Sequence, residues 1–233
     1  IWSLIKFQNI ENIKKIYLTA SGGPFLNKKN SQLTNIKPKY ALKHPNWKMG
    51  KKISIDSATL MNKIFEVIEA KKIFKLDYEQ LKILIHPKSY VHSIIKFNNG
   101  ITKILIHDTD MSIPIYNSIY DNKKKYFKRT FLDLKKINNL NFSKINKKKF
   151  QSINIIKSVP TNNSLYETVL VSANDMLVDS FLKKKIKFTD INYKLKKILN
   201  LSEFKRLNKV YPKTLKQIID TDKKVRLKTK FYI

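Results

Sequence analysis

The order of apolar and polar residues divides the chain into a first part with strand patterns and a last part with helical patterns. Residues 14–20 (KKIYLTA) predict a short strand that runs into a turn at residues 21–24 (SGGP). Three further apolar runs predict strands, with a hairpin turn at Asn98-Asn99-Gly100. These strands are expected at residues 81–86, 90–97 and 101–107.

Helical spacing predicts the remaining elements. Residues 57–75 carry apolar residues around most of the circumference, so we expect a largely buried helix with Asp56 or Ser57 as its N-cap. Residues 25–52 show little periodicity apart from a helical piece at 38–42, which is typical of a long loop. The last part of the chain predicts helices at residues 164–185, 189–200 and 214–228.

This order of elements predicts the fold class. We expect an α/β (α+β) catalytic domain with a mixed sheet and a long active-site loop, followed by a small all-α helical C-terminal domain. Residues 1–121 are expected to form the catalytic domain, 122–150 a lysine- and asparagine-rich connector, and 151–233 the helical domain.

The charge of the chain is extreme, with 48 basic and 17 acidic residues. Only Arg129, Arg206 and Arg226 are arginines, and the abundance of Lys, Asn, Ile, Tyr and Phe is typical of an AT-rich genome. Base readout relies on arginine, and stacking relies on clustered aromatics, and neither is clustered here. We therefore expect no specific nucleic-acid partner, although a basic nucleic-acid-binding module stays open as an alternative.

Cysteine and long apolar runs are both missing from the sequence. Disulfides and thiolate metal sites are therefore excluded, and no run approaches the roughly 18 residues that a bilayer span requires. We expect a cytoplasmic bacterial protein without a membrane partner, with a plastid source left open. The chain begins at Ile1 inside folded sequence, so we expect a fragment.

Two features in the first part could bind a ligand. The Ser21-Gly22-Gly23 turn offers backbone N–H groups and a hydroxyl to an anion, although an ordinary turn explains it too. In the long loop, His44, Trp47 and Met49 could close over a small polar ligand as a lid, or the loop could pack its own aromatic residue on the domain.

The predicted helix at residues 57–75 carries the densest group of polar candidates. Asn62, Glu66 and Glu69 form a narrow stripe at helical spacing, with Lys63 beside it, and Ser57 is expected at the helix N-terminus, where anions are favoured. Polar groups on a buried helix need partners, and a phosphorylated ligand with a metal would supply them. The alternative is a surface ion pair between Lys63 and Glu66 with Ser57 as a plain cap.

The histidines of the strand region are interpreted as structural. His86 and His92 do not share a strand face with Ser89, which disfavours a common metal site. His107 lies near Asp108 and Asp110, but no second histidine stands at ligand spacing, so we do not favour a metal site there.

Taken together, the motifs SGGPF, HPNWxMGxKISIDSATxMNKxxExIEA, LIHPKSYVHS and DMSIPI resemble one family closely. The chain resembles 1-deoxy-D-xylulose 5-phosphate reductoisomerase over residues 15 to about 120, and SANDM at 172–176 resembles that family's helical domain more loosely. The family enzyme uses NADPH to make 2-C-methyl-D-erythritol 4-phosphate for isoprenoid synthesis by a metal-assisted rearrangement followed by hydride transfer.

The resemblance implies a role for each candidate residue. It implies that Ser21, Ser57, Asn62 and Lys63 hold the sugar-phosphate substrate. His44 and Trp47 would belong to the lid, with Met49 beside them. Glu66 would be one carboxylate ligand of a divalent metal (Mg²⁺, Mn²⁺ or Co²⁺), and Gly50 and Met111 would lie near NADPH. The family is typically a homodimer.

The sequence departs from the family in what it lacks. The family's nucleotide-binding domain and its Asp-Ser-Glu segment, which supplies two further metal carboxylates, do not occur in the 233 residues. Ala20 and Thr109 replace residues that are often glycine and proline in the family. We therefore expect this chain alone to be inactive. A separate, non-catalytic split or decayed subunit is the alternative.

Overall fold

The structure, a computed structural model, describes residues 1–120 and 132–233. The chain divides into two compact units, each of which is described by itself. The first unit comprises Ile1–Gly22, Pro45–Lys48 and Val67–Ile145, and the second comprises Gly23–His44, Met49–Glu66 and Asn146–Ile233.

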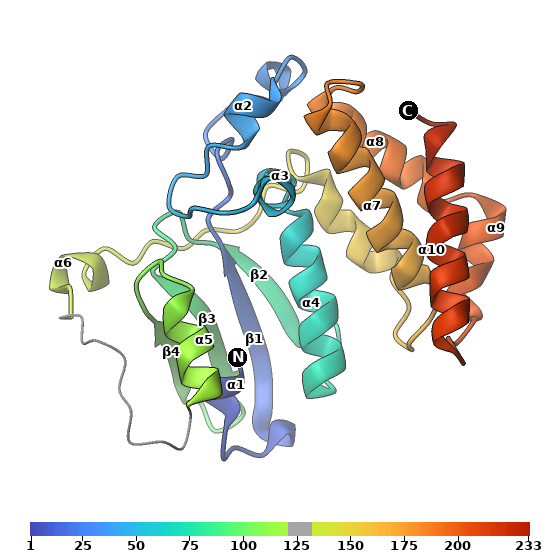
Figure 1. The fold of residues 1–233 in the computed structure, drawn as a ribbon. Coiled ribbons are helices and arrows are strands. Elements are labelled where there is room, and N and C mark those ends of the chain that lie inside the picture. The colour runs from blue at the N-terminus through green and yellow to red at the C-terminus, as the bar shows by residue number, and fades with distance from the viewer. Residues whose placement is uncertain (121–131) are drawn as a thin grey trace. The chain divides into compact units, whose positions relative to one another are not determined.

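The first unit is built on a four-stranded mixed sheet with the strand order β2-β1-β3-β4. Strand β1 pairs in parallel with β2 and antiparallel with β3, and β4 pairs antiparallel with β3, as the ribbon in Figure 1 shows. The mixed sheet expected from the sequence is therefore confirmed. The strands are β1 (Ile13–Ala20), β2 (Leu81–Ile85), β3 (Val91–Phe97) and β4 (Thr102–Ile106).

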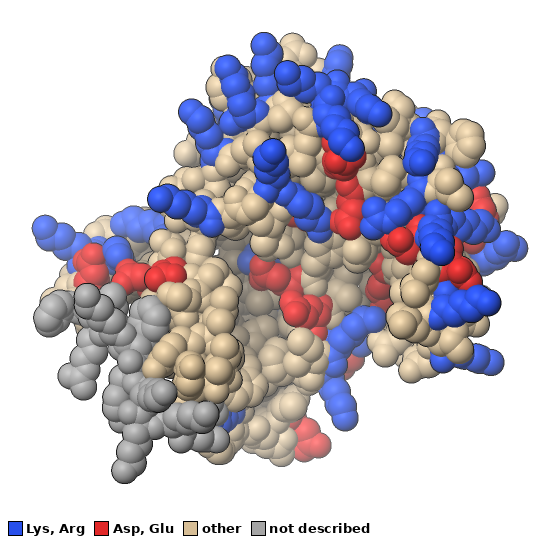
Figure 2. Space-filling view, viewed as in Figure 1, with Lys and Arg blue, Asp and Glu red and all other residues tan. Residues whose placement is uncertain are grey.

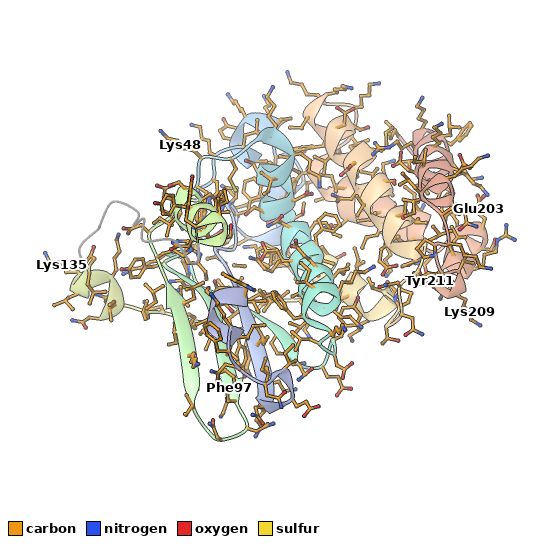
Figure 3. The ribbon with its side chains drawn as sticks, turned by 60° about the horizontal axis from the view of Figure 1, so that its bottom comes forward. Lys48, Phe97, Lys135, Glu203, Lys209 and Tyr211 are labelled. Atoms are coloured by element: carbon orange, nitrogen blue, oxygen red, sulfur yellow. The ribbon has the colours of Figure 1, made fainter. Side chains whose placement is uncertain are left out.

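Alternation along β3 creates the core of this sheet. Val91, Ser93, Ile95 and Phe97 are buried at every second position, as expected where one face of a strand packs on a core. Phe97, labelled in Figure 3, ends the strand just before the hairpin turn, where Gly100 has a φ of 87°. The predicted turn at residues 98–100 is thus present.

Short helices accompany the sheet in the first unit. They are α1 (Trp2–Ile5), the 3-10 helix η1 (Ile10–Asn12), α5 (Ser112–Ile119) and α6 (Leu134–Ile137). Helix α4 (Met61–Phe74) begins among the residues of the second unit and ends among those of the first. Ile73, near the end of α4, is 61% exposed, so the expectation of a helix buried around most of its circumference holds only for its first three turns.

The second unit is helical. Helix α7 packs against α8 and α10, and its buried residues Val169, Ala173, Leu177 and Phe181 recur at the helical spacing read from the sequence. The helices of this unit, with 3-10 helices written η, are η2 (Asn30–Leu33), α2 (Pro38–Ala41), α3 (Lys51–Thr59), η3 (Gln151–Ser158), α7 (Tyr166–Leu182), α8 (Phe188–Leu199), α9 (Ser202–Lys205), η4 (Arg206–Lys209) and α10 (Leu215–Lys230).

Ion pairs join the outer helices of this unit. Glu203 on α9, labelled in Figure 3, accepts Lys224 at 3.0 Å and Lys228 at 3.2 Å from α10. Hydrogen bonds from these two lysines lower the pKa of the Glu203 carboxyl. Elsewhere basic side chains are scattered over the face seen in Figure 2 and form no single stripe.

The fold class expected from the sequence is confirmed: an α/β part with a mixed sheet precedes a helical part. The proposed division at residues 121 and 150 stays a prediction, and the first residues of the expected connector lie outside the described part of the chain. Within residues 1–120 and 132–233, no helix combines the length and apolar character of a membrane span.

Candidate active site

The first turns of helix α4 bring three of the predicted site residues together. Asn62 donates from Nδ2 to Glu66 Oε1 at 2.7 Å, and Lys63 donates from Nζ to Glu66 Oε2, also at 2.7 Å. Both bonds follow from the helix, because side chains three and four residues apart are neighbours on its surface. The ion pair between Lys63 and Glu66 that the sequence left open is therefore present.

The Glu66 carboxylate is arranged to bind more than these two donors. Its side chain is 33% exposed and that of Lys63 is 14% exposed, so the pair is partly sheltered without being closed off. A carboxylate has about four lone-pair positions, and two of them are used here. Glu66 can therefore accept a cation or a hydroxyl while Asn62 and Lys63 hold its orientation.

Ser57 does not lie at a helix N-terminus, and this expectation was wrong. It belongs to the last turn of α3, and its carbonyl oxygen accepts the N–H of Leu60 at 3.1 Å. Leu60, with a φ of 61°, separates α3 from α4 in a left-handed conformation. The predicted single helix at residues 57–75 is thus two helices, and Ser57 belongs to the end of the first of them.

The pattern of apolar residues explains why α3 was missed. Ile53 and Ile55 stand two residues apart, a spacing typical of strands, and no acidic residue marks the first turn of α3. Ile53 is 40% exposed and Ile55 is fully buried, so the two isoleucines lie on different sides of a helix. Although Ser57 lies at the end of a helix and not at its start, its side chain is partly accessible, as a ligand-binding hydroxyl must be.

The turn after β1 requires its glycines. Gly22 and Gly23 have φ values of 83° and 65°, which residues with a Cβ rarely adopt. The predicted glycine turn at residues 21–24 is therefore present. Ser21 and Gly22 belong to the first unit and Gly23 to the second.

Part of the predicted lid packs on the sheet unit. Asn46 donates from Nδ2 to the Pro87 carbonyl at 2.5 Å and to Ser89 Oγ at 2.9 Å. The rings of Trp47 and His92 meet edge to face, with centroids 5.9 Å apart. The segment Pro45–Lys48 is therefore held by the residues between β2 and β3 and by β3 itself.

The remaining lid residues belong to the second unit. His44 is partly buried, and burial lowers the pKa of its imidazole below the ordinary 6.5, so the neutral ring is favoured. Met49 is partly buried, whereas Gly50 is exposed and forms the N-cap position of α3. The positions of His44 and Met49 are compatible with covering a ligand, and the exposure of Gly50 is compatible with a contact to NADPH.

Met111 and the strand histidines occupy different positions in the first unit. Met111 is 54% exposed just before α5. His92 stacks on His107 with centroids 3.6 Å apart, and buried His86 lies with Nδ1 2.9 Å from the Asn141 carbonyl. Across the described residues, no three His, Cys, Asp or Glu side chains group as metal ligands would.

A buried polar pair escaped the sequence analysis. Asp56, expected as an N-cap, is 1% exposed, and its Oδ1 accepts Asn174 Nδ2 of α7 at 2.8 Å. Lys52 Nζ lies 2.8 Å from the other carboxylate oxygen of Asp56. Burial raises the pKa of the Asp56 carboxyl, and Lys52 and Asn174 oppose that rise. The available signal was the polar Asn174 inside the apolar spacing of its helix.

The helical unit also contains a cavity away from these residues. It has a volume of about 690 Å³ and is lined by residues of η3, α7 and α8, among them Lys157, Tyr166 and Asn192. None of the predicted site residues lines it. Cavity size therefore does not identify the site in this chain, whereas the polar group on α4 does.

Comparison with known proteins agrees with the motifs. A family described as 1-deoxy-D-xylulose 5-phosphate reductoisomerase C-terminal domain matches residues 1–74, and one described as DXP reductoisomerase C-terminal domain matches residues 106–228. A reductoisomerase of that name from Pelagibacter ubique (strain HTCC1062) is 54% identical over 228 residues, which cover 98% of this chain and 59% of that protein.

Relatives and solved structures extend this likeness. The enzyme of Sulfurihydrogenibium sp. (strain YO3AOP1) is 40% identical over 90% of this chain and 56% of its own length. A structure of DOX-P reductoisomerase in complex with NADPH, fosmidomycin and magnesium superposes with a TM-score of 0.86 at 36% identity, covering 94% of this chain and 55% of that one. The structure of the Zymomonas mobilis enzyme in complex with NADPH superposes with a TM-score of 0.81 at 30% identity, covering 95% of this chain and 56% of that one.

The match thus runs through nearly all of this chain and somewhat more than half of each relative. It includes every motif that the sequence analysis singled out, from the glycine turn to SANDM. The chain belongs to the 1-deoxy-D-xylulose 5-phosphate reductoisomerase family.

Proposed function

We propose that this chain is the larger, C-terminal part of an NADPH-dependent enzyme that converts 1-deoxy-D-xylulose 5-phosphate to 2-C-methyl-D-erythritol 4-phosphate. Family membership supports the reaction class, and relatives were solved with NADPH, magnesium and fosmidomycin. The whole protein's activity is a proposal because the chain spans only 59% of the Pelagibacter relative. The reaction would be a metal-assisted rearrangement followed by hydride transfer.

The observation that carries this proposal is the array on the first turns of α4. Asn62 and Lys63 both donate to Glu66, so one amide, one cation and one carboxylate face the same partly sheltered spot. A phosphorylated sugar presents anionic and hydroxyl oxygens, and such an array can meet both. A surface ion pair alone would need neither Asn62 nor the shelter.

The other predicted residues take roles consistent with their positions. Ser21 and Ser57 would join Asn62 and Lys63 in holding the phosphate and hydroxyls of the substrate. His44, Trp47 and Met49 would cover it and exclude water, and the neutral His44 ring could hydrogen-bond to it. Gly50 and Met111 would lie against NADPH.

The donor set fits one edge of a divalent metal site. Glu66 offers the hard carboxylate oxygens that Mg²⁺ or Mn²⁺ prefers. Within residues 1–120 and 132–233, no three His, Cys, Asp or Glu side chains group as metal ligands would, so we propose that the Asp-Ser-Glu segment of the complete enzyme supplies the further carboxylates. When bound, the metal would polarise the carbonyl and hydroxyl oxygens of the substrate. Asn62 and Lys63 would meanwhile fix the orientation of Glu66.

Two further properties belong to this proposal. The first is that residues 1–233 alone do not turn over the substrate, because one carboxylate makes an incomplete metal site. The second is a cytoplasmic homodimer, as is typical of the family. Turnover by the purified 233-residue chain with NADPH and Mg²⁺ would contradict the first of these.

The direct test is NADPH oxidation by the complete polypeptide that contains this chain, started with 1-deoxy-D-xylulose 5-phosphate in the presence of Mg²⁺. Lys63→Met should raise KM for the substrate about tenfold or more, because a charge-assisted contact is lost. Lys72→Met, an exposed change on the same helix, is the matched control and should leave KM within about twofold. No substrate-dependent oxidation by the parent protein would overturn the proposal.

A further inference from the structure

The last turn of α3 is attached to the helical unit through a buried carboxylate. Asp56 directly precedes Ser57, and its side chain accepts the Asn174 amide of α7 at 2.8 Å. Lys52, one turn earlier on α3, lies 2.8 Å from Asp56 and 3.2 Å from Asp175 of α7. Two successive residues of α7 therefore bind two successive turns of α3.

The attachment continues to α10. Arg226 lies 3.5 Å from Asp175 and donates from Nε to Asp222 at 2.8 Å, and Ser172 Oγ donates to Asp222 at 2.6 Å. Three helices are thus joined by one polar network. Because α7 also packs along α8 and α10, the position of the α3 end is tied to the core of the helical unit.

In the described part of the chain, Asn174 contacts Asp56 through the nitrogen of its amide. The residue is completely buried, and in the described part of the chain its Oδ1 has no hydrogen-bond partner. An acceptor buried without a partner is unfavourable, whereas the Nδ2 of the same amide supplies a donor to the buried Asp56 carboxylate. Its Nδ2 must face Asp56, since the flipped amide would set two oxygens against each other. The side chain is therefore suited to fixing Asp56.

A second contact fixes the end of α3. Gly23 packs so closely that a Cβ there would lie 2.9 Å from the carbonyl oxygen of Ser57. The end of α3 is therefore held both by Gly23 and by the pair formed by Asp56 and Asn174. The hydroxyl of Ser57 is left partly exposed at a defined place.

We infer that Asp56 and Asn174 are positioning residues that hold Ser57, through the last turn of α3, in the place where it binds the phosphorylated substrate. This inference rests on the proposed function. It assigns the helical C-terminal part an indirect share in substrate binding, since Asn174 would act on the substrate through Asp56 and Ser57 without touching it.

Exchanging the pair tests this inference in the complete enzyme. Asn174→Asp sets two carboxylates against each other, whereas the double variant Asp56→Asn with Asn174→Asp restores one amide donating to one carboxylate. Asn174→Asp should raise KM about tenfold or more and weaken binding of fosmidomycin with Mg²⁺ similarly, because small misplacements of a binding group are costly. The double variant should return both values to within about threefold of the parent.

Thr229→Val is the matched control. Thr229 is fully buried in α10 and donates to the Val225 carbonyl at 2.8 Å, so this change removes a buried hydrogen bond far along the sequence from α3. It should lower Tm without moving KM. If Asn174→Asp does not fold, Asp56→Asn supplies the same comparison at constant shape.

The outcomes separate the inference from the proposed function. Variants that lower Tm but leave KM and fosmidomycin affinity within about twofold would overturn the inference, because the pair would then be only structural. A double variant that folds but is not rescued would overturn it too. A parent enzyme without turnover would overturn the proposed function and this inference with it.

Discussion

Gly23 and Ser57 lie in backbone contact, so that a Cβ on Gly23 would lie 2.9 Å from the Ser57 carbonyl oxygen and 3.0 Å from the Ala58 Cα. Contacts this short are with main-chain atoms, which cannot turn away as a side chain can. Gly23 and the end of α3 are therefore fitted to each other, although Gly23 and Ser57 stand 34 residues apart (57 − 23).

Replacing Gly23 with alanine should destabilise the protein by about 1–3 kcal/mol, because it adds a backbone clash to a positive φ. Urea unfolding followed by circular dichroism would measure the change. Gly50→Ala is the control: its φ is −60° and a Cβ there meets nothing within 4 Å. Equal stability of the two variants would contradict the fit described above.

Removing the charge of Glu66 should affect activity far more than stability. If Glu66 is a metal ligand as proposed, Glu66→Gln should lower kcat/KM of the complete enzyme about a hundredfold at saturating Mg²⁺, because a carboxylate ligand is lost. The unfolding free energy should change by less than about 1 kcal/mol, since partly exposed helix pairs contribute little. Steady-state kinetics beside thermal unfolding would measure both.

Glu69→Gln provides the comparison for Glu66, since Glu69 is exposed on the same helix three residues further along. It should leave kcat/KM within about twofold of the parent. Were both glutamine variants to lose the same activity, the effect would reflect the charge of the helix in general, and Glu66 would have no special role.

The unfolding free energy of the parent protein should fall more steeply as the pH is lowered than that of a His44→Gln variant. Burial lowers the pKa of His44 in the folded state, so the unfolded chain binds more protons as the pH falls through 6.5. Stability contributed by this group is therefore present above that pH and is lost below it. Urea midpoints of the parent and of His44→Gln, measured at about pH 7 and about pH 5, should converge at the lower pH. A constant difference between them would contradict burial of the ring.

Local patterns predicted much of the fold. The hairpin between β3 and β4 depends on Asn98-Asn99-Gly100, whose conformation is set by neighbouring residues, and Gly100 has the expected positive φ. Val169, Ala173 and Phe181 marked α7 because a helix that packs on one side repeats its apolar residues. Such signals lie within a few residues of the structure they describe.

The end of α3 could not be predicted in this way. Asp56 looked like a helix cap because aspartate usually caps when it precedes a helical pattern, yet its partner Asn174 stands 118 residues away. A contact of that separation leaves no periodic trace in one sequence. Leu60 gave no warning either, since a bulky residue with a positive φ is tolerated only where tertiary packing holds it.

The double pairing of Glu203 has a consequence for how this protein tolerates mutation. With 48 basic residues and only 17 acidic ones, carboxylates that can pair with a lysine are scarce in this chain, and exposed pairs contribute little individually. Glu203 serves Lys224 and Lys228 together, so its loss would leave two like charges one turn apart on α10. In a chain with so many lysines, the few acidic residues that pair with more than one of them should therefore tolerate substitution least.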